Sequence, residues 1–416
     1  MLRYLNQRIV FVPTHQPLRV FMTTDGNERQ RALDPLAYQQ SVIDHLKREE
    51  PHAWEWSSSA GSDREADEVR DSMLRDTYRI EQTGHPQVFE ACRTAMTRVG
   101  IEAPVTLYQA TDGSMNASLV YVPGEVHLVF FGPILEKLNP AELLALMGHE
   151  LAHYLLWSMA ERDHYRASRV LDHALSYSDA KPSHRETARL LSLHTELFAD
   201  RGAALAAGAP GPAIAVLVKV MTGLSNVDPD AYLRQAAEIE AKSDKSQGLS
   251  HPEIYLRARA LQLWWDGDPG LDAWLRKHLH GPLSIEALDL MGQSKLTQMT
   301  RAFLARFLTE IEEPGAEIVT QLRAVFADFG RQEERLLDLA EIGVEWIDDA
   351  TRDYFVALMF DVAMADPDAT DAVMLAAAKT AAEIGATERL TGALRRDLKW
   401  TKTRSDRLVT QAAKAV

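Results

Sequence analysis

The chain has 416 residues, of which 46% are hydrophobic and 25% are charged, and this composition indicates a folded protein with two or three cores rather than a disordered chain. Its 60 acidic residues outnumber its 45 basic residues, and the net charge of −15 opposes attraction to a phosphate backbone, so we expect no nucleic-acid partner. The single cysteine, Cys92, excludes an intramolecular disulfide and fits a reducing compartment.

Residues 1–69 precede the first informative motif, and we treat them as an N-terminal extension of uncertain fold. Residues 9–12 predict a strand. The first residues lack the apolar segment and cleavage site of a signal peptide, so we expect a cytoplasmic protein. The most membrane-like stretch, residues 203–224, is mostly alanine and contains glycine, proline and lysine, so we expect no membrane span.

The pentapeptide His149-Glu150-Leu151-Ala152-His153 lies within an apolar run that predicts a buried helix. Two histidines four residues apart share one face of a helix, where their ring nitrogens can bind one ion beside Glu150. H-E-x-x-H is the pattern of zinc peptidases. The alternative is an amphipathic helix that carries two histidines without a metal.

A third ligand is predicted at Glu196, four residues before Asp200. One helix can then offer the Glu196 carboxylate to the metal and the Asp200 carboxylate to the N–H of a liganding histidine. Three protein ligands leave a fourth position for water, whereas structural zinc sites are closed by four ligands that usually include cysteine. With one cysteine in the chain, we expect one catalytic Zn²⁺ held by His149, His153 and Glu196.

These motifs and their spacing resemble the gluzincin metallopeptidases of family forty-eight, which includes HtpX and the CAAX prenyl proteases. Further matching segments lie at residues 78–80, 85–86, 105–108, 115–117, 126–130 and 139–143, and at His251-Pro252 followed by Arg257. The match covers roughly residues 70–262. It implies a mainly α fold with a small β-sheet (α+β), an active-site helix and an edge strand. Residues 126–130 themselves predict a strand.

The zinc site implies a mechanism. Zinc lowers the pKa of its bound water toward about 7, so Glu150 can act as the general base. The developing oxyanion needs a further donor, for which the resemblance suggests His251 first and Tyr255 second. The alternative is that His251-Pro252 begins a helix, with Pro252 at the first helical position.

The resemblance also implies that Asn116 and Ala117 belong to an edge strand, to which an extended substrate adds as a further strand. The alternative is an ordinary turn after residues 112–114. The insertion between His153 and Glu196 could cover the cleft. Residues 228–250 predict a polar connection without a regular core pattern, because Asp228-Pro229-Asp230 interrupts it.

Residues 284–416 show helical periodicity throughout and predict a separate bundle. Within it, residues 354–398 are similar to TerB-like modules of the tellurite-resistance type. The acidic turn at residues 366–371 has two readings: oxygen ligands for a hard cation, or helix capping by Asp368 or Thr370, which we favour. We expect this bundle to bind a protein partner, to self-associate or to regulate.

The sequence thus predicts three parts: an extension (residues 1–69), a zinc metallopeptidase domain (70–275) and a helical bundle (284–416). The expected function is a zinc-dependent metalloendopeptidase that hydrolyses unfolded or extended protein or peptide substrates. The alternative is a latent or non-catalytic zinc-containing scaffold or sensor that works through its C-terminal bundle. Glu150 favours the enzyme, because metal binding alone does not require a base at that position.

Overall fold

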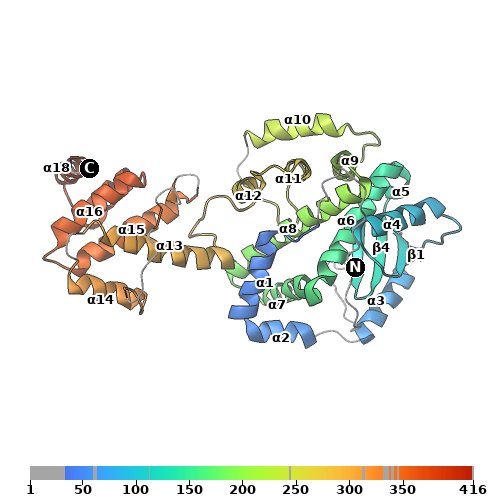
Figure 1. Cartoon of the computed structure of the whole chain (residues 1–416), viewed down its shortest axis with the longest axis horizontal. Helices are drawn as coiled ribbons and strands as arrows, with labels where there is room; N and C mark the ends of the chain where they lie inside the picture. The colour runs from blue at the N-terminus through green and yellow to red at the C-terminus, as the bar shows by residue number, and fades with distance from the viewer. Residues whose placement is uncertain are drawn as a thin grey trace. The chain divides into compact units, whose positions relative to one another are not determined.

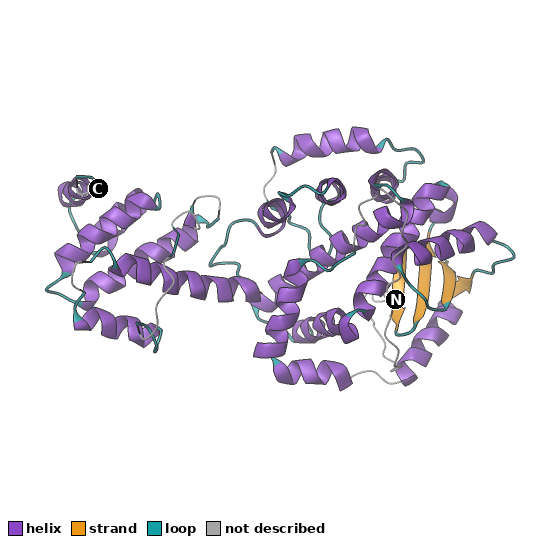
Figure 2. Ribbon diagram, viewed as in Figure 1, coloured by secondary structure: helices purple, strands orange, loops and turns teal. Residues whose placement is uncertain are grey.

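The computed structural model describes residues 33–59, 63–111, 113–242, 245–311, 314–330, 337–338, 342–343 and 346–414. Contacts divide the chain into two units, Met1–His280 and Gly281–Val416, each with its own hydrophobic core. The described residues are mostly helical with one small sheet, which confirms the mainly α class with a small β-sheet (Figure 2). The strand predicted at residues 9–12 lies outside the described residues, and the three predicted domain boundaries stay predictions.

The sheet of the first unit contains strands β1 (Thr77–Arg79), β2 (Val105–Ala110), β3 (Asn116–Val122) and β4 (Glu125–Phe131) in the order β1-β2-β4-β3. Strands β2 and β4 are parallel, and the other two pairings are antiparallel. The strand predicted at residues 126–130 is therefore confirmed. Among the described residues, β1 and β3 are the two edges of this sheet.

The first unit contains twelve α-helices among the described residues, and the sheet lies at one side of the unit (Figure 1). They are α1 (Ala37–Glu49), α2 (Pro51–Ser59), α3 (Asp63–Asp76), α4 (Pro86–Val99), α5 (Ile134–Lys137), α6 (Pro140–Ser158), α7 (Asp163–Leu175), α8 (Pro182–Ala207), α9 (Pro210–Thr222), α10 (Pro229–Glu240), α11 (Ile254–Asp266) and α12 (Leu271–Leu275). Helices α6 and α8 pack closely against each other, and α4, α7 and α9 contact both.

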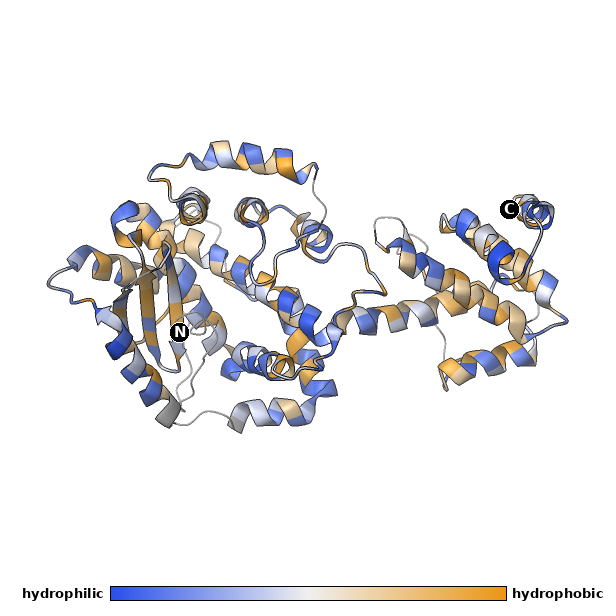
Figure 3. Cartoon of the chain, turned by 180° about the vertical axis from the view of Figure 1, so that it is seen from behind, coloured by the Kyte–Doolittle hydropathy of each residue, from blue (hydrophilic) through white to orange (hydrophobic). Residues whose placement is uncertain are grey.

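Side chains alternate between the two faces of the sheet, as the pleat requires. Leu128 and Phe130 of β4 are fully buried in the main core, together with residues of α4 and α6. Val129, between them, faces the other side and packs with Tyr108 and with Met73 of α3. Figure 3 shows the apolar character of these strands. The sheet thus lies between α3 on one face and α4 and α6 on the other.

Helix α10 corrects the prediction of an irregular polar connection at residues 228–250. Asp228 accepts hydrogen bonds from the backbone N–H groups of Asp230 and Ala231, at 3.0 and 3.2 Å, and Pro229 occupies the first turn. The tripeptide that was interpreted as a break is therefore a helix start. Only Ala236 is buried in α10, which explains why the segment shows no core pattern.

The second unit contains helices α13 (Leu290–Leu308), α14 (Ala316–Val325), α15 (Asp349–Ala365), α16 (Thr370–Glu383), α17 (Thr387–Asp397) and α18 (Lys402–Ala412). The aromatic residues Phe303, Phe307 and Phe355 are fully buried in its core. Among the described residues of this region, the helices that the periodicity predicted are therefore confirmed.

The turn before α16 differs from its prediction. Asp366 accepts from the N–H groups of Asp368 and Ala369, at 3.0 and 3.3 Å, and Thr370 donates its hydroxyl to carbonyls of the preceding turn. Capping by Asp368 or Thr370 is therefore wrong: the residue at the N-cap is Ala369, which makes no side-chain cap. The carboxylate of Asp366 instead satisfies the N–H groups that follow Pro367, as an Asx turn does.

Candidate metal centre

The start of α6 is held by a capping box. Asn139 accepts from the N–H groups of Ala141 and Glu142, each at 3.0 Å, while the Glu142 carboxylate accepts from the Asn139 N–H at 2.8 Å. Lys219 of α9 forms a buried ion pair with Glu142, at 2.6 Å. Pro140 occupies the first turn. These contacts fix the helix that carries His149 and His153.

Helices α6 and α8 approach each other at backbone distance. A Cβ atom added at Gly148 would overlap the Ala206 side chain and lie 2.5 Å from the Gly202 carbonyl. A Cβ atom added at Gly202 would overlap the Ala152 side chain and lie 2.8 Å from the Gly148 carbonyl. Small residues four positions apart on both helices therefore bring the two ligand-bearing helices together.

His149, His153 and Glu196 converge where these helices face each other. The two histidine Nε2 atoms are 3.3 Å apart, and Glu196 places Oε2 3.5 Å from Nε2 of His149 and Oε1 3.7 Å from Nε2 of His153. Donor atoms that lie 2.0–2.1 Å from a tetrahedral metal are about 3.3–3.4 Å apart. One ligand atom from each of the three groups lies within 4.8 Å of the others.

The chemistry of these donors fits a divalent cation. Glu196 and His153 are buried, and Oε2 of Glu196 makes no hydrogen bond. Two imidazoles and one carboxylate form the set of ligands typical of a catalytic zinc site with an open fourth position. A divalent cation at this point would bind this buried oxygen, whose nearest positive side chain is the guanidinium of Arg257 at 3.2 Å.

Asp200 and Arg257 surround these donors. The Nδ1 atom of His149 lies 3.2 Å from Oδ1 of Asp200, which leaves Nε2 of the ring to face Glu196 and His153. Arg257 donates to both oxygens of Asp200, at 2.8 and 2.7 Å, and its guanidinium lies 3.2 Å from Oε2 of Glu196. The sequence resemblance included Arg257 but gave it no role.

The charges of this cluster oppose the effect of burial. Burial alone would raise the pKa values of Glu196 and Asp200. Arg257 and His149 instead lower the pKa of Asp200, and Arg257 together with the neighbouring histidines brings that of Glu196 well below its usual range. Burial would lower the pKa of His149, but its close contacts with the carboxylates of Asp200 and Glu196 raise it to about 10. A metal ligand must be a neutral imidazole, so metal binding releases this proton.

Glu150 lies in a different environment from the other carboxylates. Burial raises its pKa, the charge of Glu196 adds to this, and His149 opposes it. A backbone hydrogen bond from Leu119 of β3 reaches its carboxylate. Glu150 is therefore a buried carboxylate beside both the donor cluster and the edge strand, with a raised affinity for a proton.

His251 also reaches this cluster. Its Nε2 atom lies 3.3 Å from Oε1 of Glu196, and its Nδ1 atom lies 2.8 Å from the Ser250 hydroxyl. Helix α11 begins at Ile254, with Glu253 at the N-cap, so the alternative in which Pro252 starts the helix is wrong. The structure thus places His251 at the candidate metal centre.

Asn116 and Ala117 begin β3, so the alternative of an ordinary turn at these residues is wrong. Asn116 is exposed and Ala117 is buried.

The insertion between His153 and Glu196 forms α7 and the first half of α8, and α7 packs against α6 and α8. Its histidines His164, His184 and His194 are buried.

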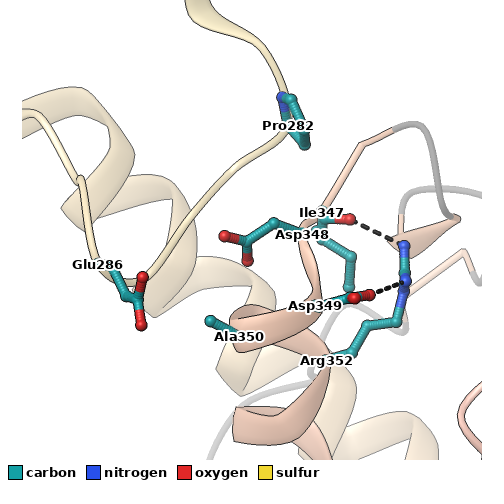
Figure 4. Close-up of a pocket in the computed structure, with 7 residues that line it drawn as sticks. All are labelled: Pro282, Glu286, Ile347, Asp348, Asp349, Ala350 and Arg352. Carbon is teal, nitrogen blue, oxygen red and sulfur yellow. Dashed lines mark hydrogen bonds and ion pairs between the residues drawn. The ribbon is translucent and has the colours of Figure 1, made fainter.

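The second unit contains an open pocket, which is lined by charged residues at the start of α15 (Figure 4). Asp348, on its wall, accepts from the backbone N–H of Thr351 at 2.8 Å. Arg352 donates to Asp349 at 2.8 Å and to the carbonyl of Ile347 at 2.9 Å. These charged groups hold the start of α15, which accounts for their presence there.

Comparison with known proteins agrees with this geometry. Residues 85–264 match the family model described as Peptidase family M48, and this match supports a metallopeptidase. The plastoglobule-localized metallopeptidase 48, chloroplastic, of Arabidopsis thaliana is 29% identical over 185 residues, which cover 40% of this chain and 53% of that protein. The chain therefore spans about half the length of this curated relative. No solved structure matches the chain.

The family match leaves the finer resemblances as predictions. The matched segment ends at residue 264, so it does not test the similarity of residues 354–398 to TerB-like modules. The similarity to HtpX and the CAAX prenyl proteases within the family also stays a prediction. In the part of the chain that the structure describes, no helix has the length and apolar character needed to span a membrane.

Proposed function

We propose that the chain is a zinc-dependent metalloendopeptidase that hydrolyses peptide bonds, with one Zn²⁺ held by His149, His153 and Glu196. The observation that carries this proposal is the convergence of these three donors beside Glu150, at spacings suited to a tetrahedral ion. The match to Peptidase family M48 over residues 85–264 supports it.

A bound Zn²⁺ supplies a Lewis acid that polarises the peptide carbonyl and lowers the pKa of water. Glu150, with its raised pKa, takes a proton from the attacking water and passes it to the leaving amine. His251 donates from Nε2 to the carbonyl oxygen as negative charge develops there. Asp200 holds the ring of His149 through Nδ1, and Arg257 holds Asp200.

The substrate is an extended or unfolded segment of protein. Strand β3 pairs with β4 on one side, and the N–H of Leu119 reaches Glu150. A polypeptide that adds to β3 along Asn116 and Ala117 would therefore run beside the general base. Recognition through the main chain tolerates varied side chains, which suits a peptidase that acts on unfolded proteins.

Two further proposals concern the rest of the chain. The helices of the second unit serve as a docking, self-association or regulatory module, consistent with the TerB-like similarity of residues 354–398. A cytoplasmic location is also proposed. The plastoglobule in the printed name of the plant relative belongs to that protein.

The test combines metal analysis with proteolysis. Wild-type protein and Glu150→Gln, purified in parallel, are measured for bound zinc by mass spectrometry and for cleavage of casein. Both should hold about one zinc per chain, because the substitution leaves the three ligands intact, and only the wild type should cut. Glu90→Gln, an exposed change on α4, is the matched control and should cut like the wild type.

Three other outcomes would contradict the proposal, and each identifies the part of it that is wrong. If the wild type and Glu150→Gln hold zinc and neither cuts, the alternative of a latent or non-catalytic zinc scaffold replaces the peptidase. Cleavage by Glu150→Gln at the wild-type rate would remove Glu150 from the mechanism. If neither protein holds a metal, His149, His153 and Glu196 are not ligands.

A further inference from the structure

The segment that carries His251 is fastened to its surroundings on both sides of Leu249. Arg189 of α8 donates to the carbonyl of Gly248 at 3.0 Å, and the hydroxyl of Ser192, also on α8, donates to the carbonyl of Ser250 at 3.0 Å. The Gly248–Leu249 and Ser250–His251 peptide groups are thus tied to the helix that carries Glu196.

Arg189 and the residues just before Leu249 are held by further hydrogen bonds. Arg189 forms two further hydrogen bonds to Glu186, at 2.8 and 2.7 Å, which orient its guanidinium. Ser246 is buried, and it donates its N–H to the carbonyl of His278 at 2.7 Å and its hydroxyl to Glu253 at 2.7 Å. A side chain at Gly248 would overlap the His251 carbonyl, so the turn between them is closed tightly.

Leu249 projects from this braced turn into solvent. Its exposure is 81%, the highest of any large hydrophobic side chain among the described residues. An exposed leucine needs no explanation by itself, since single apolar residues are common on protein surfaces. Two features distinguish Leu249: its backbone is fixed, and it is two residues from His251, so their Cα atoms are at most about 7 Å apart.

We propose that Leu249 is a specificity-determining residue, which contacts an apolar side chain of the substrate close to the scissile bond. This inference rests on the proposed peptidase function. Peptides with a leucine- or phenylalanine-like side chain at one fixed position relative to the cut are then the preferred substrates. A rigid contact suits this role, because little conformational entropy is lost when the substrate covers it.

The groups beside Leu249 indicate that its partner is apolar. Ser250 and Gly248 offer no apolar surface, and their carbonyls are already bonded to α8. Leu249 is therefore the group of this turn that gains from contact with an apolar partner, since burial of its exposed apolar surface is favourable. Main-chain pairing along β3 would set the register, and Leu249 would select the side chain.

The first measurement compares cleavage sites. Wild-type, Leu249→Ser and Leu249→Met proteins digest denatured casein, and mass spectrometry identifies the residues around each cut. The wild type should favour apolar residues at one position, Leu249→Met should keep this preference, and Leu249→Ser should lose it, with kcat/KM for apolar sites reduced about tenfold. Leu74→Ser, an exposed change on α3 across the sheet from α6, should behave like the wild type.

The second measurement does not need catalysis. Zinc-loaded Glu150→Gln and Glu150→Gln/Leu249→Ser proteins are titrated with fluorescein-labelled decapeptides that differ in one central residue, leucine or serine. The single variant should bind the leucine peptide about tenfold more tightly than the serine peptide, and the double variant should bind both equally. Zinc content and melting temperature should match between the two proteins.

The outcomes separate this inference from the proposed function. If the wild type cuts casein but Leu249→Ser cuts the same sites at the same rate, the role of Leu249 is wrong and the peptidase stands. If the wild type does not cut, the peptidase fails, and the peptide titration still decides whether Leu249 selects apolar ligands. Equal binding of both peptides by the single variant would overturn the inference.

Discussion

Arg257 is the residue on which the buried carboxylates of the metal centre depend. It is itself buried and contacts Asp200 and Glu196. We expect Arg257→Met to destabilise the first unit by about 3–5 kcal/mol, because two buried carboxylates lose their counter-charge. Arg257→Lys should recover only part, since an ammonium cannot make both bonds to Asp200. Urea unfolding at pH 7 in the presence of a chelator measures both effects.

A control on the same helix tests this reasoning. Arg259 of α11 pairs with Glu240 at 2.9 Å, and both side chains are partly exposed. Arg259→Met should therefore cost about 1 kcal/mol or less. Added zinc should restore stability to Arg257→Met, because a bound cation replaces part of the missing charge. Equal losses for the two variants would contradict the central place of Arg257.

Some residues of the metal centre can be predicted from their spacing in the sequence, and others cannot. A spacing of four on one helix is local, so His149, His153, Glu196 and Asp200 could be named as candidate donors from the sequence alone. The role of Arg257 depends on how α11 packs against α8, which spacing does not encode. The same holds for Leu249, whose exposure follows from the bonds of its neighbours.

The crossing of α6 and α8 is the element on which the donor spacing depends. Gly202→Ala places a Cβ against Ala152 and the Gly148 carbonyl, so the helices must separate. We expect zinc affinity to fall about 10- to 100-fold, as when groups that orient metal ligands are disturbed, and stability to fall by about 1–3 kcal/mol. Competition with a fluorescent zinc chelator measures the affinity.

A second substitution gives this prediction a matched rescue. Ala152→Gly removes the side chain that the new Cβ meets first, so Ala152→Gly/Gly202→Ala should regain part of the zinc affinity. Gly392→Ala, on α17 with open space around it, should leave affinity unchanged. If Gly202→Ala binds zinc like the wild type, the close crossing does not set the donor spacing.

The sequence predicted several helices of the structure but not how they pack against one another. The apolar run before His149 and the periodicity after residue 284 predicted helices that the structure contains. Helix α10 was missed because it buries only Ala236, so no apolar stripe marks it. The glycines at positions 148 and 202 are visible in the sequence, but only the fold shows that they face each other.

The histidines are distributed unequally between the two units. All 14 histidines lie in residues 1–280, and none lies in residues 281–416. His164 of α7 is buried, and burial, aided by Lys47 against the opposing charge of Asp163, lowers its pKa to about 4. An unfolded histidine titrates near 6.5, so between pH 6.5 and 4 the unfolded state binds more protons, and stability falls as the pH falls.

The raised pKa of His149 does not cancel this effect. With a folded pKa of about 10, its stabilising contribution is complete below pH 6.5, so it adds no slope in the acidic window. We therefore expect His164 to contribute a loss of about 1.5 kcal/mol to the first unit between pH 6.5 and 5, while the second unit changes little. Asp172 of α7 opposes part of this loss, because desolvation raises its pKa to about 6. Hydrogen exchange of peptides from each core, measured in the full chain with a chelator and corrected for intrinsic rates, resolves the two units.

Two variants on α7 test whether His164 causes the acid sensitivity of the first unit. His164→Gln removes the buried imidazole, so the first unit should lose stability less steeply as the pH falls. His173→Gln, an exposed change on the same helix, should keep the wild-type slope. Equal acid sensitivity of both units would show that they unfold together, and an unchanged slope in His164→Gln would assign the effect to other histidines. If the first unit loses stability with falling pH and the second unit does not, acid weakens the unit that contains the candidate metal centre and leaves the second unit folded.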